Sequence, residues 1–194
     1  MRVITGEYKG RKLESPAGSD IRPTSDKVKE SIVNLLMNDC YGAVFCDLFC
    51  GAGGLGIEAL SRGASKCYFC DNSRESIRLT KSNLAHVGAE EKAVVLFGEY
   101  TRALNRIREP IDVFLIDPPY RAGLYEKCLE LISNLDLLSP DGIIVAEHDS
   151  RGDMPETVGD LTKVRERRYG KTSVSIYRHA AYLEDAGDPE EDER

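Results

Sequence analysis

Long hydrophobic runs are missing from this sequence of 194 residues. Charged residues interrupt every apolar stretch before it approaches the roughly 18 residues that a membrane-spanning helix needs. The opening segment MRVITGEYKGRKL has no apolar core of the kind that a secretory signal carries. No internal repeat or low-complexity stretch precedes the acidic end of the chain. We therefore expect a soluble, cytoplasmic protein whose length suits one domain, or one domain with a small appendage.

Residue patterns for a metal site or a hydrolase are also scarce. Cys67-x-x-Cys70 has the spacing of zinc ligands, but no second pair follows it. On a strand, these two side chains would point to opposite faces. The motif G-x-S-x-G is absent, and the three histidines stand apart from any nucleophile motif. We expect no metal, and we expect buried free thiols at all six cysteines: Cys40, Cys46, Cys50, Cys67, Cys70 and Cys128.

The net charge of −7 is concentrated at the C-terminus. Residues 183–194 hold seven of the 33 acids and one of the 26 bases, so the rest of the chain is nearly neutral. We expect residues 180–194 to form an acidic, disordered tail, because they offer few apolar groups to bury. Two basic segments, 1–12 and 163–178, either bind a polyanion or form solvated strand faces. The first segment has four bases against one acid: Arg2, Lys9, Arg11 and Lys12.

Strand and helix patterns alternate along most of the chain. Apolar runs predict five strands, at 44–48, 66–70, 93–97, 111–116 and 142–147. Helical spacing predicts helices near 54–62, 73–87, 99–108 and 123–136. Ser73 and Gly88 are the expected caps of the second helix. Two further β-like runs, 162–169 and 172–178, should form a hairpin. This order predicts an α/β, doubly wound, Rossmann-like sheet of seven strands, in which an antiparallel pair extends five parallel strands.

The first 37 residues precede this alternating pattern. Residues 2–5 and 11–14 flank the turn GEYKG and predict an N-terminal β-hairpin. A helix capped by Thr24 or Ser25 should follow and run to about Met37. We therefore expect a hairpin and linker at 1–24, a main domain at 25–179, and the tail.

The first of the five strands leads into a glycine-rich turn, Asp47-Leu-Phe-Cys-Gly51-Ala-Gly53-Gly-Leu-Gly56. Glycines let the backbone turn sharply and approach a ligand, and the start of the next helix offers free N–H groups. Asp71 ends the next strand, where a carboxylate can accept hydrogen bonds from ribose hydroxyls. The pattern fits a dinucleotide or S-adenosylmethionine. The simpler alternative is a turn that only packs helix against strand.

The motif Asp117-Pro118-Pro119-Tyr120 follows the fourth of these strands, at the edge where ligands of such folds bind. The prolines stiffen the backbone and fix the direction of the carbonyl groups. The Asp117 carboxylate and the Pro118 carbonyl can then accept both protons of a planar amino group and hold its nitrogen in line with a methyl sulfonium. Tyr120 offers a ring for stacking a base. The motif favours S-adenosylmethionine, with a nucleobase amine as acceptor.

Together these motifs resemble the amino-methyltransferases, in which D/N-P-P-Y/F/W marks methylation of an exocyclic nitrogen. Several segments resemble the bacterial 16S rRNA guanine-N2 methyltransferases of the RsmD type: MRVITGEYKGRKLESPAG, IRPTSDKVKESIVNLL, DLFCGAGGLGIEALSRGA, DPPY and RRYGKTSVSIY. The match runs from residue 1 to about 178. It implies a class I methyltransferase fold, S-adenosylmethionine as cofactor, and 16S rRNA or the small ribosomal subunit as partner. We expect a monomer, although the sequence itself leaves the oligomeric state open. The DPPY motif alone leaves adenine N6, cytosine N4 and guanine N2 open.

The resemblance also implies roles for individual residues. Gly51 and Gly53 would approach the methionyl part of the cofactor, and Asp71 would hold its ribose. Glu99 or Tyr100 would lie near the adenine, although relatives often have Asp where Glu99 stands. The other expected site residues are cofactor-binding Asp47 and Asn72, catalytic Asp117, Pro118, Pro119 and Tyr120, and RNA-binding Arg2, Lys9, Arg11, Lys12 and Arg22.

Two other functions compete with this one. A nicotinamide-dependent oxidoreductase would use the same glycine turn, but it would leave the DPPY motif as an accident. Such enzymes usually add a substrate domain, and residues 183–194 are too few to form one. A non-catalytic RNA-binding module would have no physical reason to keep both Asp117 and the glycines.

Overall fold

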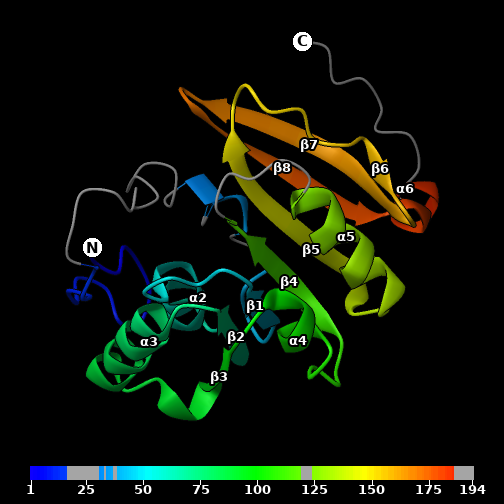
Figure 1. The fold of residues 1–194 in the computed structure, drawn as a ribbon. Coiled ribbons are helices and arrows are strands. Elements are labelled where there is room, and N and C mark those ends of the chain that lie inside the picture. The colour runs from blue at the N-terminus through cyan, green and yellow to red at the C-terminus, as the bar shows by residue number, and fades with distance from the viewer. Residues whose placement is uncertain (17–30, 33, 37–38, 119–123, 186–194) are drawn as a thin grey trace.

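A computed structural model describes residues 1–16, 31–32, 34–36, 39–118 and 124–185 (Figure 1). Its centre is an eight-stranded sheet in the order β3-β2-β1-β4-β5-β8-β7-β6. The first five strands in this order are parallel, and the last three continue the sheet antiparallel. The strands are Val44–Asp47 (β1), Lys66–Asp71 (β2), Ala93–Phe97 (β3), Ile111–Ile116 (β4), Leu138–Asp149 (β5), Thr157–Val158 (β6), Leu161–Tyr169 (β7) and Thr172–His179 (β8).

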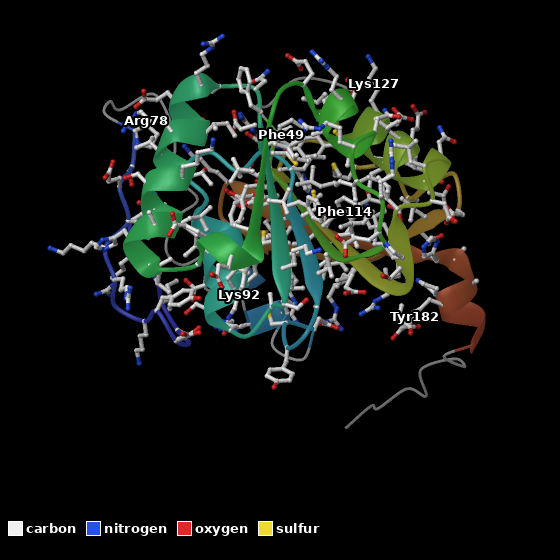
Figure 2. The ribbon with its side chains drawn as sticks, turned by 90° about the horizontal axis from the view of Figure 1, so that it is seen from below. Phe49, Arg78, Lys92, Phe114, Lys127 and Tyr182 are labelled. Carbon is white, nitrogen blue, oxygen red and sulfur yellow. The ribbon has the colours of Figure 1, made fainter. Side chains whose placement is uncertain are left out.

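Helices cover both faces of the parallel strands (Figures 1 and 2). They are Gly54–Ser61 (α2), Arg74–Val87 (α3), Tyr100–Leu104 (α4) and Leu124–Asn134 (α5), with a 3₁₀ turn at Glu90–Lys92. The short helix Ala180–Asp185 (α6) follows β8, at the end of the antiparallel strands (Figure 1). Helices α2 and α3 bury Ile57 and Leu84 in the core on one face, while α4 and α5 bury Leu104 and Leu129 on the other. Burial on both faces explains why these strands are continuous apolar runs in the sequence.

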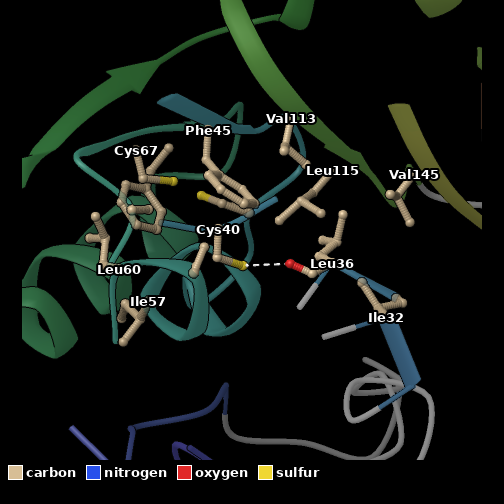
Figure 3. Packing of buried hydrophobic residues seen from close by; sticks show 14 of the residues in the cluster. Ile32, Leu36, Cys40, Phe45, Ile57, Leu60, Cys67, Val113, Leu115 and Val145 are labelled. Carbon is tan, nitrogen blue, oxygen red and sulfur yellow. Dashed lines mark hydrogen bonds between the residues drawn. The ribbon is translucent and has the colours of Figure 1, made fainter. Parts of the chain in front are cut away.

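The expected helix near residue 37 is confirmed where it is described. Ser31, Ile32, Asn34 and Leu35 are helical, and the predicted start lies outside the described residues. Figure 3 shows Ile32 and Leu36 beside Leu115, in the core cluster that also contains Phe45. The Cys40 thiol donates to the carbonyl oxygen of Leu36 at 3.1 Å. This segment therefore packs on the same sheet face as α2.

All seven expected strands are present, and β6 is an addition. It contains two residues, paired with Leu161 and Thr162 of β7, and so short a run has no sequence signature. Cys67 and Cys70 belong to the core clusters on opposite faces, as predicted, and all six cysteines are buried and free. Within the described residues, no helix is long and apolar enough to span a membrane, and no three His, Cys, Asp or Glu side chains are grouped for a metal.

The helix ends test the predicted caps. The Ser73 hydroxyl accepts the N–H of Ser76 at 3.2 Å, and Gly88 has a φ of 73° after the last turn, so both caps of α3 are confirmed. Helix α4 ends at Leu104, earlier than expected. The expectation of disorder from residue 180 was wrong at its beginning, because Ala180–Asp185 form α6, where the Tyr182 ring lies 4.3 Å from the guanidinium of Arg178. Residues 186–194 lie outside the described residues.

The N-terminal arm, residues 1–16, pairs as a hairpin at one antiparallel bridge, between Arg2 and Lys12. Longer pairing between its two halves is prevented because part of its backbone bonds to α2. The N–H groups of Ile4 and Thr5 donate to the carboxylate of Glu58 in α2, at 2.9 and 2.8 Å. Three apolar side chains of the arm join the core cluster on the α2 face: Val3, Tyr8 and Leu13. The arm is therefore part of the main core.

Candidate active site

Three acidic residues lie at one edge of the sheet, at the ends of neighbouring parallel strands. Asp47 ends β1, Asp71 ends β2, and Asp117 follows the last residue of β4. The register pairs Asp47 with Phe69 of β2 and with Leu115 of β4, so the three strand ends lie side by side. This is the edge at which open α/β sheets bind their ligands.

Asp47 is buried beneath the glycine turn. Its Oδ2 accepts the N–H of Gly56 at 3.0 Å, and the residue is 4% exposed. A negative charge close to the N-terminus of α2 is also favourable for the helix dipole. Asp47 therefore orients the start of α2, a contact with the protein itself that the sequence had not indicated.

The glycine turn between β1 and α2 depends on backbone conformations that other residues rarely adopt. Gly51 has a φ of 54° and Gly53 a φ of 80°. The N–H of Gly53 closes the turn by donating to the carbonyl oxygen of Cys50 at 2.7 Å. At Gly56 a Cβ would lie 2.4 Å from Cε1 of Phe69, so α2 approaches β2 too closely for a larger residue. At Gly51, by contrast, a Cβ would meet no atom within 4 Å, which leaves space for a ligand.

Asp71 is half-buried, and both of its carboxylate oxygens bond to the backbone. Oδ2 accepts the N–H of Gly51 at 2.9 Å, and Oδ1 accepts the N–H of Ser73 at 2.8 Å. The sequence had suggested only ribose hydroxyls as partners. A carboxylate has about four acceptor positions, so each oxygen can still accept one further hydrogen bond. Asp71 can hold the turn and a ribose together.

The expected adenine contacts lie beside Asp71. The side-chain amide of Asn72 donates to Glu99 at 3.0 Å, and both residues are exposed. Tyr100 starts α4, and its ring centroid lies 5.9 Å from that of Phe49 in the glycine turn, with a tilt of 44°. Burial raises the pKa of Tyr100, so its hydroxyl stays neutral. Phe49, which Figure 2 labels, was not among the predicted site residues.

Asp117 and Pro118 extend β4 beyond its last paired residue. Asp117 is half-buried and Pro118 is buried, while Pro119 and Tyr120 lie outside the described residues. Ile116 pairs with Ala146 of β5, so Asp117 comes next to Glu147, in the last part of that longer strand. There the Tyr125 hydroxyl of α5 donates to the carbonyl oxygen of Glu147 at 2.7 Å. This bond fixes α5 beside the strand end that carries Asp117.

Four of the five cations expected to bind RNA are exposed on the arm: Arg2, Lys9, Arg11 and Lys12. Arg11 already has partners in the protein, because its guanidinium donates to the carbonyl oxygen of His86 at 3.1 Å and lies 5.8 Å from the ring centroid of Tyr8. Lys9 and Lys12 form no ion pair within the described part of the chain. Arg22 lies outside that part.

The second basic segment lies mainly on β7. Lys163 is turned inward, with a side chain 12% exposed, and pairs with Glu156 at 2.7 Å and Glu166 at 3.3 Å. The hydrogen bond to Glu156 raises the pKa of Lys163, so it stays charged. Three bases of this strand remain exposed: Arg165, Arg167 and Arg168.

Two buried polar side chains of α3 hold the glycine turn and were missed in the sequence. Thr80 Oγ1 donates to the carbonyl oxygen of Gly51, and Asn83 Nδ2 to that of Ala52, both at 2.9 Å. Thr80 is 0% and Asn83 1% exposed. The available signal was two polar residues, three apart, on an otherwise apolar helix face. That pattern does not identify their partners.

Comparison with known proteins gives a family. The family model described as "Conserved hypothetical protein 95" matches residues 1–178. "Putative rRNA methyltransferase YlbH" of Bacillus subtilis is 45% identical over 181 residues, which cover 92% of this chain and 98% of that protein. "Ribosomal RNA small subunit methyltransferase D" of Escherichia coli is 30% identical over 191 residues, which cover 97% of this chain and 94% of that protein.

Solved structures of methyltransferases have the same fold as this chain. "Putative methyltransferase yhhF from Escherichia coli" superposes with a TM-score of 0.83 at 29% identity, covering 92% of this chain and 97% of that one. The methylase HI0767 of Haemophilus influenzae, titled a "putative methylase", gives 0.77 at 30% identity over 92% and 97%. The expected class I methyltransferase fold is confirmed, and S-adenosylmethionine is favoured over a nicotinamide dinucleotide. The chain belongs to the Conserved hypothetical protein 95 family, the RsmD-type methyltransferases that use S-adenosylmethionine.

Proposed function

We propose that this chain transfers a methyl group from S-adenosylmethionine to the exocyclic N2 of a guanine in 16S rRNA. The observation that carries the proposal is the position of Asp117 and Pro118 at the end of β4, on the same sheet edge as the glycine turn and Asp71. The Escherichia coli relative is named for the RNA of the small ribosomal subunit. This name supports the same class of substrate here.

The residues at the sheet edge fit the cofactor in chemistry. Space beside Gly51 suits the methionyl part, and the remaining acceptor positions of Asp71 suit the two ribose hydroxyls. The side chains of Asn72, Glu99 and Tyr100 would border the adenine. Asp47 would contribute indirectly, through its bond to Gly56.

S-adenosylmethionine supplies a methyl carbon bonded to a positively charged sulfur. The Asp117 carboxylate and the Pro118 carbonyl would each accept one N–H of the target amine, which aims the nitrogen lone pair at that carbon. As the N–C bond forms and the C–S bond breaks, positive charge grows on the nitrogen, and the carboxylate stabilises it. The proton then leaves the nitrogen for solvent. Pro119 would stiffen this loop and Tyr120 would stack on the base.

The RNA would extend from this site over the arm, where Arg2, Lys9, Lys12 and Arg22 would contact phosphates. Arg11 would contribute its positive charge while it donates a hydrogen bond to the carbonyl oxygen of His86. We infer a cytoplasmic enzyme, because ribosomal RNA is its substrate, and one that acts as a monomer without a metal. Light scattering of the pure protein at working concentration tests the monomer, and activity retained in a chelator tests the absence of a metal.

The decisive experiment identifies the methylated nucleoside. Tritiated S-adenosylmethionine is incubated with 16S rRNA, or with small subunits, from cells that lack their own enzyme of this type. The RNA is then digested and its nucleosides are separated by mass. We expect label in N2-methylguanosine, and far less of it with Asp117→Ala at the same early time point. Label in N6-methyladenosine would show that adenine, and not guanine, is the target base. No label in any RNA would overturn the proposal.

A further inference from the structure

Asn83 in α3 joins two segments that are far apart in the sequence. Its Nδ2 donates to the carbonyl oxygens of Ala52, at 2.9 Å, and of Glu14, at 3.0 Å. Its Oδ1 accepts the N–H of Glu14 at 2.7 Å. Both amide hydrogens and the amide oxygen are therefore used, in a site that is 1% exposed. One side chain divides its hydrogen bonds between the glycine turn and the N-terminal arm.

These bonds determine how the peptide planes of the turn lie. Thr80 holds the carbonyl of Gly51 toward α3, and Asn83 does the same for Ala52. A trans peptide is planar, with its N–H opposite its C=O. The N–H of Ala52 therefore points away from α3. The N–H of Gly53 donates to the carbonyl oxygen of Cys50. Rotation of either peptide would break a bond to α3.

A second contact brings the arm to the same place. A Cβ built on Gly54, the first residue of α2, would lie 2.5 Å from the sulfur of Met1. The Met1 side chain thus covers the start of the helix that follows the turn. The Met1 carbonyl accepts the N–H of Leu13 at 2.9 Å. This bond links Met1 to the part of the arm that leads to Glu14.

We propose that Asn83 is a positioning residue that couples the N-terminal arm to the glycine turn. S-adenosylmethionine at the turn restrains the Ala52 carbonyl, and through Asn83 it restrains the backbone at Glu14. RNA held on the arm strengthens cofactor binding in return, because a coupling free energy is the same in both directions. The coupling rests on the proposed RNA function, and its first test does not need RNA.

That first test is hydrogen exchange with and without S-adenosylmethionine. Three amides report on the arm through bonds within it: Val3 to Arg11 at 3.0 Å, Gly10 to Val3 at 2.9 Å and Leu13 to Met1 at 2.9 Å. We expect cofactor to slow their exchange about fivefold or more, the lower end of ordinary coupling. Asn83→Ala should abolish this slowing. The matched control is Asn105→Ala, because Asn105 is exposed and its side-chain amide donates to the carbonyl oxygen of Thr101 in α4 at 2.8 Å, far from the arm in the sequence.

The second test measures cofactor affinity by calorimetry, with and without saturating 16S rRNA. In the wild type the ratio of the two dissociation constants should be about five or more, and in Asn83→Ala it should fall toward one. A merely structural residue would lower the melting temperature but leave this ratio unchanged. Asn83→Asp serves if the alanine variant does not fold. It keeps the acceptor for the N–H of Glu14 and loses the donors to the carbonyl oxygens of Ala52 and Glu14, so the bond to the turn is removed while one bond to the arm remains.

The outcomes separate the coupling from the function on which it rests. Cofactor that binds the wild type without slowing exchange in the arm overturns the coupling alone. An unchanged affinity ratio in a folded Asn83 variant does the same. Slowed arm exchange in a wild type that methylates no RNA supports the coupling and overturns the proposed function.

Discussion

Asp71 and Gly51 stand 20 residues apart, and the N–H of Gly51 donates to Oδ2 of Asp71 at 2.9 Å. The other oxygen of the same carboxylate accepts the N–H of Ser73, the N-cap of α3, at 2.8 Å. A single side chain therefore holds the turn, the start of α3 and, by our proposal, the ribose. Cofactor affinity and the stability of the turn should respond together when it is changed.

The first prediction is that Asp71→Ala weakens S-adenosylmethionine binding by about 1.5–3 kcal/mol, the usual contribution of a hydrogen bond to a charged group. The melting temperature should also fall, because the N–H groups of Gly51 and Ser73 lose their acceptor. Calorimetry and thermal unfolding measure the two effects. Asp71→Asn keeps one acceptor oxygen and should lose less of both. Unchanged affinity in the alanine variant would remove Asp71 from the cofactor site.

The second prediction separates chemistry from binding. Asp117→Ala should lower the single-turnover rate of methyl transfer by about 100-fold or more, as for other lost transition-state contacts. Cofactor affinity should stay close to that of the wild type, because the turn and Asp71 are untouched. Asp141→Ala, an exposed acid in the first half of β5, is the control. A near-normal rate would exclude Asp117 as the group that stabilises the charge.

The third prediction concerns the arm. Replacing Lys9 and Lys12 by alanine should flatten the log–log salt dependence of RNA binding by about 1.4–1.8 units, at roughly 0.7–0.9 per phosphate contact. These two lysines are the best choice, because Arg11 also bonds His86 and its loss would disturb α3. The comparison variant replaces the exposed bases of β7: Arg165, Arg167 and Arg168. A slope that changes only in the β7 variant would place the RNA there.

The fourth prediction is that Glu58→Ala destabilises the fold. Glu58 is 0% exposed and accepts the N–H groups of Ile4 and Thr5 at 2.9 and 2.8 Å. A fully buried donor without an acceptor costs about 1–3 kcal/mol. Because Ile4 and Thr5 are only half-buried, we expect a loss in the lower part of that range for each, about 2–4 kcal/mol together, in denaturant unfolding. Glu75→Ala removes an exposed pair with Arg78 and should change stability by less than about 1 kcal/mol. Equal effects would show that Glu58 does not anchor the arm.

The meeting of the candidate site residues at one sheet edge could be predicted, because the order of strand, glycine turn, helix, strand and acid determines that edge. The glycine positions followed from the same order, and Gly51 and Gly53 do adopt positive φ. The partners of Asp71 could not be predicted. They depend on the direction of two backbone N–H groups, and that direction exists only once β2 is beside β1.

The arm shows a different limit. Its bases and its turn indicated a hairpin, but its docking depends on contacts with α2, 50 or more residues away. At Gly6 a Cβ would lie 1.9 Å from the carbonyl oxygen of Ser61, so the backbones of the two segments touch. The presence of a glycine in a turn does not predict which distant segment will pack against it. Asn83 is similar, since one buried amide in a helix does not identify the two segments that it joins.

The six buried cysteines have a practical consequence. Burial raises the pKa of Cys128 to about 12 and holds the pKa of Cys46, Cys50 and Cys67 well above the usual value. A thiol that is both protonated and shielded does not react with an alkylating reagent. Because thiols of this kind lie on both sides of the sheet, full labelling requires both layers to open. The rate of thiol labelling therefore reports how often the folded state opens, and it can be measured on the unmodified chain with and without its ligands.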